Sequence, residues 1–372
     1  MYEKYSAEWA LSPIWNGNEA INESVMFIEG RDTAKLLYDA VEIESVMSTD
    51  HSIVYREGVD YELLDGCLHR LRDSSIPVFP LDQYYPAEHR DGHDFGCTVE
   101  GHPYLVYGEN DTFISKQVDV TYRHAGKWSG RMPADCSGMF GRFHEKLRSG
   151  KPATILFYGD SITTGCNSTG TFDRAPYLPS FPYMIASAIA DKYSYTASFE
   201  VDPHIDHATA PRPLEGERVL HYINTAVGGM DARWGLENVD ERVNKYSPDL
   251  VVLAFGMNDG WKLPEEFMDL TTCTIERIHE ANPDCEICIV STMLPHFRAA
   301  GFFGHQIEYE AYLEKYAENY DYIAVAPMTS VHGCLLERKE FYDMTGNNVN
   351  HCNDYLARVY AMTILKTIDN QG

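Results

Sequence analysis

Ser161 is the first residue of this sequence whose type and position could support chemistry. It ends the triplet Gly159-Asp160-Ser161, which directly follows the apolar run ATILFY. A serine at a strand-to-helix turn exposes its hydroxyl above the sheet, as a nucleophile requires, and the N–H groups that begin the next helix can stabilise an oxyanion. Taken alone, however, the triplet is more typical of a serine that caps a helix.

Two other segments end apolar runs with residues that could hold an oxyanion. NTAVGG, residues 224–229, ends in two glycines. Because glycine has no side chain, the backbone there can approach a ligand closely. Gly256-Met257-Asn258-Asp259 follows DLVVLAF, so Asn258 could point its amide into the crevice that holds Ser161. Each segment alone also fits an ordinary turn.

A histidine near the end of the chain could supply a base. His351 ends Asn348-Val349-Asn350-His351, just before a predicted C-terminal helix. From that loop its imidazole could take the proton of Ser161. Because the chain has 15 histidines, a surface or capping role is the more common explanation for any one of them.

Together, in this order and each at a strand or helix boundary, the four segments resemble the block pattern of the SGNH or GDSL hydrolase superfamily over residues ~150–370. The resemblance implies a flavodoxin-like three-layer α/β/α fold and ester hydrolysis without a metal or organic cofactor. It makes Ser161 the nucleophile and His351 the base. The N–H groups of Ser161 and Gly229 and the side-chain amide of Asn258 would form the oxyanion hole.

One position departs from the family pattern. The family usually has an Asp three residues before the catalytic His, and here that residue is Asn348. An Asn can accept a hydrogen bond from the imidazole, but it does not offset the imidazolium charge as a carboxylate does. Dyad carbohydrate esterases of the superfamily use Ser and His with a backbone carbonyl or a weaker third partner. We expect Asn348 to orient His351 and Asp354 to begin the helix. Asp343 is a less favoured candidate for the partner of His351.

The elements that must position these residues follow from periodicity. From about Glu19 to Arg123, short alternating segments such as VMFIEG and QVDVTYRH predict an all-β, jelly-roll-like sandwich. From Lys151, strands alternate with helices, which predicts an α/β fold whose parallel sheet is covered on both faces. We therefore expect a β-sandwich accessory domain at 1–147, packed against an SGNH catalytic domain at 148–372 and forming one wall of its crevice. FHEKLRSGKP, residues 143–152, would be the linker.

The order of the two domains adds a weaker resemblance. Carbohydrate esterases of the second family also carry a β-sandwich before an SGNH domain, and this similarity lies at the level of architecture. Near the expected crevice lie Trp234, Trp261, His296 and Phe297. Flat rings stack on sugars, so the two tryptophans are candidate substrate-binding residues, with core or rim packing as the equal alternative.

The composition restricts the partners. Asp and Glu number 56 against 30 Lys and Arg, which gives a net charge of −26. Such a surface repels phosphate backbones and anionic membranes, so we expect neither nucleic acid nor membrane as a partner. The N-terminus shows no signal peptide and the chain shows no ~18-residue apolar run, which favours a cytoplasmic protein. The sequence leaves a homo-oligomer open.

Other motifs favour structural roles. The nine cysteines are expected to be reduced, and Cys285 and Cys288 belong to an apolar run that predicts a buried strand. The segment His204–His207 is expected to be a solvated loop, not a metal site. Asn167-Ser168-Thr169 is formally a glycosylation sequon, but a glycan so close to Ser161 would block the site.

We therefore expect a serine esterase that removes acetyl groups from neutral, plant cell-wall type oligosaccharides. The acidic charge disfavours acyl-CoA, and the polar loops around Ser161, CNSTGTFDRAP and HIDHATAPRPLEGE, offer little to a long acyl chain. Two alternatives stay open. One is a lipase or thioesterase of the GDSL type, and the other is a catalytically degenerate carbohydrate-binding protein.

Overall fold

The computed structural model describes residues 7–204 and 214–371. Most of the loop segment expected at His204–His207, namely residues 205–207, lies outside the described residues. No helix in the described part of the chain is long and apolar enough to cross a membrane.

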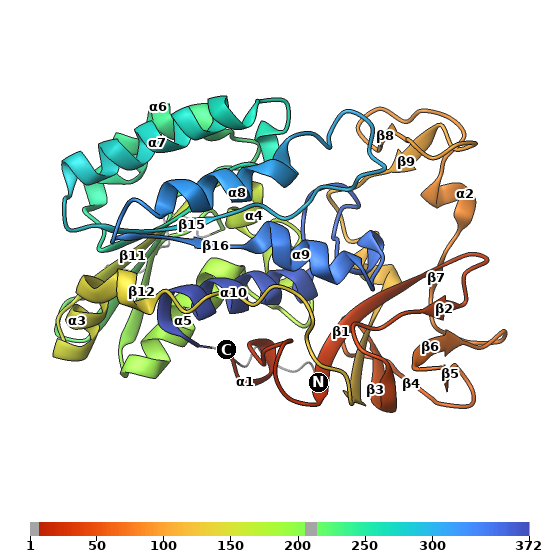
Figure 1. Cartoon of the computed structure of the whole chain (residues 1–372). Helices are drawn as coiled ribbons and strands as arrows, with labels where there is room; N and C mark the ends of the chain where they lie inside the picture. Colours follow the sequence, from red (N-terminus) through yellow and green to blue (C-terminus); the bar gives the residue numbers. More distant parts are fainter. Residues whose placement is uncertain (1–6, 205–213, 372) are drawn as a thin grey trace.

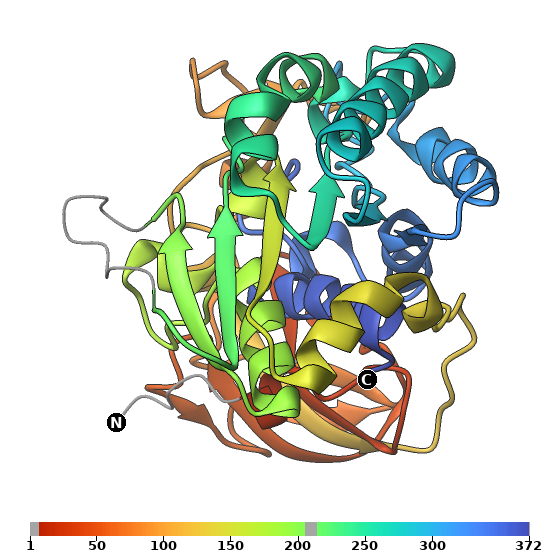
Figure 2. The same ribbon diagram turned by 90° about the vertical axis from the view of Figure 1, so that its left-hand side faces the viewer.

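A six-stranded sheet forms the centre of the C-terminal part of the chain. Its strands are β11 (Ala153–Gly159), β12 (Thr196–Val201), β13 (Val219–Asn224), β14 (Leu250–Ala254), β15 (Glu286–Val290) and β16 (Ile323–Ala326). They pair in the order β12-β13-β11-β14-β15-β16, all parallel. Figure 2 shows the arrows of β11, β12, β13 and β14 pointing the same way. Without the edge strand β12, this is the 2-1-3-4-5 order of flavodoxin-like folds.

Both faces of this sheet are covered by helices, as the alternation of strands and helices predicts. Figure 1 shows α5 and α10 on one side and α6, α7 and α8 on the other. Along β11, Ile155 and Phe157 join the core cluster on the first side, whereas Leu156 and Tyr158 join the cluster on the second. The helices of the chain are α1 (Ala7–Ala10), α2 (Leu81–Tyr84), α3 (Gly141–Ser149), α4 (Ser161–Thr164), α5 (Phe181–Tyr193), α6 (Ala232–Arg242), α7 (Pro264–Ala281), α8 (Gln306–Ala317), α9 (Met328–Leu336) and α10 (Asp354–Asp369).

Strands are the main regular elements of the N-terminal region, residues 7–124. They are β1 (Glu19–Ile28), β2 (Thr33–Ala34), β3 (Ala40–Ser48), β4 (Val54–Tyr55), β5 (Tyr61–Leu64), β6 (Cys67–Arg70), β7 (Val78–Phe79), β8 (Asp94–Gly96), β9 (Tyr104–Val106) and β10 (Gln117–His124). They pair into sheets of five, three and two strands, with β4-β3-β10-β1-β7 the largest. The more specific expectation of a jelly-roll-like sandwich stays a prediction.

The segment expected to be a linker, residues 143–152, is for the most part a helix. Helix α3 covers Gly141–Ser149, and its Phe143 and Leu147 are buried in the core. The N–H groups of Arg142 and Phe143 donate to the carboxylate of Glu286 at 2.8 and 3.0 Å. Phe143 and Leu147 lie four residues apart, a spacing that indicates one face of a helix and not a linker.

The N-terminal region packs directly against the α/β region, residues 137–371. Lys339 Nζ donates to Glu23 Oε1 at 2.6 Å and to the carbonyl of Ser24 at 2.8 Å, and both side chains are buried. The N–H of Met26 donates to Asp343 Oδ1 at 2.8 Å. One hydrophobic cluster contains residues of both regions, including Val25 and Phe157. The two regions therefore form a continuous packed body.

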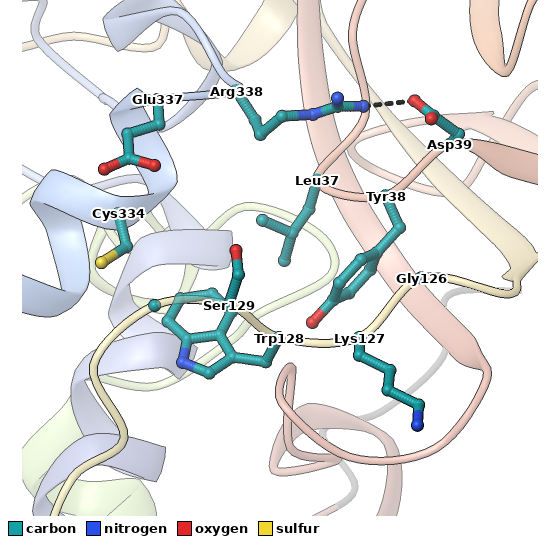
Figure 3. A pocket seen from close by; sticks show the side chains of 11 residues that line it. Leu37, Tyr38, Asp39, Gly126, Lys127, Trp128, Ser129, Cys334, Glu337 and Arg338 are labelled. Carbon is teal, nitrogen blue, oxygen red and sulfur yellow. Dashed lines mark hydrogen bonds and ion pairs between the residues drawn. The ribbon is translucent and has the colours of Figure 1, made fainter.

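A cavity of about 290 Å³ lies where the two regions meet (Figure 3). Tyr38 and Trp128 contribute rings to it, and Arg338 pairs with Asp39 at its edge. It shares no lining residue with the cavity that contains Ser161.

Candidate active site

Ser161 is positioned by the end of β11 and the first turn of α4. Asp160 caps this helix, and its carboxylate accepts the N–H of Ile162 at 3.0 Å. Burial raises the pKa of Asp160 to about 7. A side chain on Gly159 would lie 2.4 Å from Thr163 Oγ1 and 2.5 Å from the carbonyl of Ala254, so only glycine fits there. The turn therefore fixes the direction of the Ser161 hydroxyl.

The structure brings Ser161 and His351 together, as the family pattern implies. His351 Nε2 lies 2.8 Å from Ser161 Oγ, and both residues are 5% exposed. The loop that carries the histidine is held by Asn347, whose Oδ1 accepts the N–H groups of Val349, Asn350 and His351, each at 3.0 Å. This is the geometry of a nucleophile and its base.

The other ring nitrogen of His351 faces two side chains that sequence reasoning missed. His351 Nδ1 lies 2.7 Å from Asn167 Oδ1 and 3.0 Å from Glu109 Oε2. If Nε2 is to accept the serine proton, Nδ1 must carry the ring hydrogen, and both oxygens can accept it. Asn167 follows α4, whereas Glu109 follows β9 in the N-terminal region.

The Glu109 carboxylate is anchored on its second oxygen. Tyr107 donates its hydroxyl to Oε1, and Asn347 donates its amide to the same atom at 3.2 Å. Burial alone would raise the pKa of Glu109, but the hydrogen bond and charge of His351, followed by the bonds from Tyr107 and Asn347, outweigh it and lower that pKa. The carboxylate is therefore held in its ionised form beside the ring.

Asn348 does not take the position that the sequence predicted for it. Its Nδ2 donates to the carbonyl of Val106 at 3.1 Å, and its Oδ1 accepts the hydroxyl of Tyr84 at 3.1 Å. Both ends of the amide thus bind the N-terminal region, and the expectation that Asn348 orients His351 is corrected. Its backbone φ is +70°, in the left-handed region.

The two aspartates considered beside Asn348 also have other partners. Asp343 accepts the N–H groups of Met26 and Glu340. Asp354 is the first residue of α10, as expected, and accepts the N–H and hydroxyl of Thr169 at 2.8 and 2.6 Å.

The residues expected to bind an oxyanion line the same cavity as Ser161. Gly229 and Asn258 both contribute to its wall, and a Cβ on Gly228 would lie 3.7 Å from that of Ser161. Asn258 Nδ2 donates one hydrogen to the carbonyl of Met230 at 3.0 Å, which orients the amide and leaves the second hydrogen for a ligand. Gly229 has a φ of +77°, a conformation that favours glycine.

A buried lysine ties these two oxyanion segments to each other. Lys262 Nζ lies 2.8 Å from Asp259 Oδ1 and 2.7 Å from Asp231 Oδ2, and the lysine side chain is fully buried. Asp259 follows Asn258 directly, and Asp231 lies two residues after Gly229. Asp231 also caps α6, and Asp259 accepts the N–H of Ala232. Sequence reasoning did not identify this network.

The cavity that contains Ser161 has a volume of about 550 Å³ and a wall of aromatic rings. Phe95 and Tyr107 come from the N-terminal region, whereas Phe172, at the end of a 3-10 helix, and Phe302 come from the α/β region. Phe95 contacts Tyr107 and Phe302 edge-on, with ring centroids 5.2 and 6.0 Å apart. The N-terminal region therefore forms one wall of the cavity, as expected. The lining of the cavity is more apolar than the polar sequences of the loops expected around Ser161 had indicated.

The aromatic residues that the sequence suggested lie outside this lining. Trp234 packs against Tyr158, with Arg242 over its ring. Trp261 is 70% exposed, and its ring lies over the Lys262 ammonium at 4.0 Å. The remaining two are the buried His296, which stacks on Phe341, and the exposed Phe297. The structure places neither tryptophan where it would contact a ligand beside Ser161.

Two of the residues in the other polar motifs, His204 and Asn167, lie at the site. All nine cysteines are free, and Cys285 and Cys288 are buried. Among the described residues, no group of three or more His, Cys, Asp or Glu could hold a metal ion. His204 lines the cavity and bonds the carbonyl of Thr164 at 2.7 Å. Asn167 is 1% exposed, and its amide is engaged with His351 and Gly346.

Solved structures with a related shape are distant in sequence. A two-domain esterase active on acetylated mannans, co-crystallized with mannopentaose, is 16% identical, with a TM-score of 0.47; the match covers 64% of this chain and 55% of the esterase. An acetyl xylan esterase is 16% identical, with a TM-score of 0.40, and the match covers 57% of this chain and 98% of that one. A catalytic mutant of an acetylxylan esterase from Geobacillus stearothermophilus is 16% identical, with a TM-score of 0.41 and coverages of 58% and 94%.

No curated protein matches the chain significantly. The chain spans only about half the length of the mannan-active esterase. In contrast, the model of the GDSL-like lipase/acylhydrolase family matches residues 157–354, more than half of the 372 residues. The matched segment includes Ser161, Gly229, Asn258 and His351. The chain therefore belongs to the GDSL-like lipase/acylhydrolase family.

Proposed function

We propose that this hydrolase removes O-acetyl groups from neutral oligosaccharides of plant cell-wall type, with Ser161 as the nucleophile. The observation that carries the catalytic part is the 2.8 Å contact between Ser161 Oγ and His351 Nε2 inside the cavity. An acylhydrolase needs such a pair, and the glycine turn of Gly229 and the oriented amide of Asn258 in the same cavity support the proposal. Asn348 and the two tryptophans have no part in the proposal.

In the first half of the reaction, His351 Nε2 takes the hydroxyl proton as Ser161 Oγ attacks the ester carbonyl carbon. The carbonyl oxygen becomes an oxyanion, which the N–H groups of Ser161 and Gly229 and the free amide hydrogen of Asn258 stabilise. The alcohol oxygen then leaves with the proton held by His351, and the acyl group stays on Ser161. In the second half, His351 takes a proton from a water molecule as the water oxygen attacks the acyl carbon. Ser161 Oγ then leaves with that proton, and the carboxylic acid is released.

Two features support a neutral sugar as the alcohol. The excess of 56 acidic over 30 basic residues disfavours anionic substrates such as acyl-CoA. The rings of Phe95, Tyr107, Phe172 and Phe302 offer apolar faces around Ser161, and the C–H faces of sugars stack on such rings. Because Phe95 and Tyr107 belong to the N-terminal region, that region would contribute to substrate binding. We propose that the enzyme acts in the cytoplasm, apart from membranes and nucleic acid.

The same aromatic wall favours a second candidate function, a GDSL-type lipase or thioesterase. Apolar rings can also bury an acyl chain, and each buried CH₂ contributes about 0.8 kcal/mol. The two functions differ in which part of the ester contacts the wall, the alcohol or the acyl group.

A chain-length series separates the two functions. Rates would be measured on aryl acetate, butyrate and octanoate, together with acetate release from acetylated xylo- and manno-oligosaccharides, and the Ser161→Ala variant would serve as the blank. The acetyl esterase proposal predicts a steep fall from acetate to butyrate, no octanoate hydrolysis, and acetate release from the oligosaccharides. A preference for octanoate would reject it in favour of the lipase function. No turnover of any ester would favour the remaining alternative, a carbohydrate-binding protein.

A further inference from the structure

The ring hydrogen on His351 Nδ1 has two acceptors, and only one of them is charged. Asn167 Oδ1 is the nearer at 2.7 Å, and Glu109 Oε2 lies at 3.0 Å. A neutral amide can hold the ring in place, but only a carboxylate also offsets the positive charge that the imidazole gains when it takes the serine proton. Glu109 therefore has the chemistry that Asn348 and Asn167 lack.

The loop of His351 binds the Glu109 segment through two consecutive asparagines. Asn347 Nδ2 donates to Glu109 Oε1 at 3.2 Å, and Asn348 Nδ2 donates to the carbonyl of Val106, three residues earlier, at 3.1 Å. Amide side chains can donate these bonds, whereas an aspartate at position 348 would present oxygen to the Val106 carbonyl. The residue that departs from the family pattern thus helps to hold another carboxylate beside the histidine.

From this arrangement we propose that Glu109 of the N-terminal region is the acidic positioning residue of His351, so that the two regions together form one catalytic site. The inference rests on the proposed function, since it concerns the base of that reaction. Tyr107 and Asn347 occupy Oε1, which leaves Oε2 to face the ring. Asn167 sets the ring orientation in the resting enzyme, and Glu109 stabilises the imidazolium as it forms.

The expected size of the effect follows from exposure. The Glu109 side chain is 45% exposed, so solvent weakens its interaction with the ring compared with a buried triad acid. Loss of the charge in a serine protease triad costs about 10⁴-fold in kcat. Because Glu109 is half-exposed and Asn167 provides a second acceptor, we expect the Glu109→Gln variant to lose about 10- to 100-fold in kcat.

The test compares Glu109→Gln with Glu100→Gln, which removes an exposed carboxylate from the same region. Measurements on the full chain would be kcat, KM and the pH profile of kcat/KM with an aryl acetate, and the rate at which a serine-reactive phosphonate labels Ser161. For Glu109→Gln we expect lower kcat and slower labelling, with KM within about twofold. The acidic limb of the profile should move to lower pH, because the imidazolium loses a neighbouring negative charge. Glu100→Gln should behave as the unmodified protein.

A Glu109→Gln variant whose kcat and pH profile match those of Glu100→Gln would overturn this inference. The Ser161→Ala variant, assayed in parallel, distinguishes a failure of the role of Glu109 from a failure of the proposed function. If Ser161→Ala is inactive while Glu109→Gln is fully active, only the role of Glu109 is lost. If Ser161→Ala hydrolyses the ester as the unmodified protein does, the proposed function itself is wrong.

Discussion

Residue type alone did not reveal what Asn348 does. Its place in the family pattern suggested a partner for His351, yet its amide binds Val106 and Tyr84. Sequence could place Ser161 and His351 because each lies next to an element boundary in the family order. It could not find Glu109, because 242 residues separate it from His351 and no local pattern relates the two. Such a contact depends on how the N-terminal region docks.

The Asn348→Asp variant tests this correction at the scale of one residue. The substitution restores the residue that the family usually has there, but in this structure its carboxylate would face the Val106 carbonyl in a fully buried position. We expect kcat to fall or stay unchanged, and the free energy of unfolding to drop by about 1–3 kcal/mol for the lost hydrogen bond and the buried charge. Kinetics on an aryl acetate and urea unfolding measure both. A higher kcat would show that residue 348 does serve His351.

At the scale of elements, the strand ends determine most of the site. Ser161, Gly229 and Asn258 follow β11, β13 and β14, which are neighbours in the sheet, so their positions could be predicted from the strand pattern. The edge strand β12 was not anticipated, because TASFEV lacks a continuous apolar run. The helical identity of residues 141–149 was also missed, since the charged residues of FHEKLRSGKP obscured its two buried positions.

The Lys262 network leads to a prediction about the loops between elements. Replacing Lys262 with Met leaves the carboxylates of Asp231 and Asp259 without their shared cation, so the segments of Gly229 and Asn258 should lose their mutual alignment. We expect kcat to fall about tenfold or more, less than the 10²- to 10³-fold cost of deleting an oxyanion donor, with KM little changed.

The matched control is Arg233→Met, which breaks the exposed pair between Arg233 of α6 and Glu266 of α7. This variant should keep its kcat, because exposed pairs contribute little. Circular dichroism confirms that both proteins are folded before the rates are compared. Equal kcat in the Lys262→Met and unmodified proteins would show that the network does not align the oxyanion segments.

At the scale of the whole molecule, the N-terminal region is part of one packed body with the α/β region. It contributes Phe95, Tyr107 and Glu109 to the cavity around Ser161. The buried pair between Lys339 and Glu23 joins it to the α/β region. The change from strands to alternating strands and helices predicted two regions, but composition carries no information about the surface through which they pack.

The Lys339→Met variant tests this packing. It leaves the Glu23 carboxylate buried without its cation, and breaking such a pair costs about 3–5 kcal/mol. Arg338→Met, the neighbouring control, removes an exposed pair with Asp39 and should cost less than about 1 kcal/mol. Urea unfolding followed by tryptophan fluorescence gives both values. Similar values for the two variants would contradict a central role for the buried pair in docking.

The claim on which the rest depends is that Ser161 is the nucleophile. The most direct measurement treats the protein with a serine-reactive phosphonate, identifies the labelled peptide by mass spectrometry, and compares kcat on an aryl acetate for the unmodified protein and the Ser161→Ala variant. We predict that Ser161 alone is labelled, and that the variant keeps its fold while losing about three orders of magnitude or more in kcat. Labelling of a different residue, or undiminished hydrolysis by Ser161→Ala, would contradict the account.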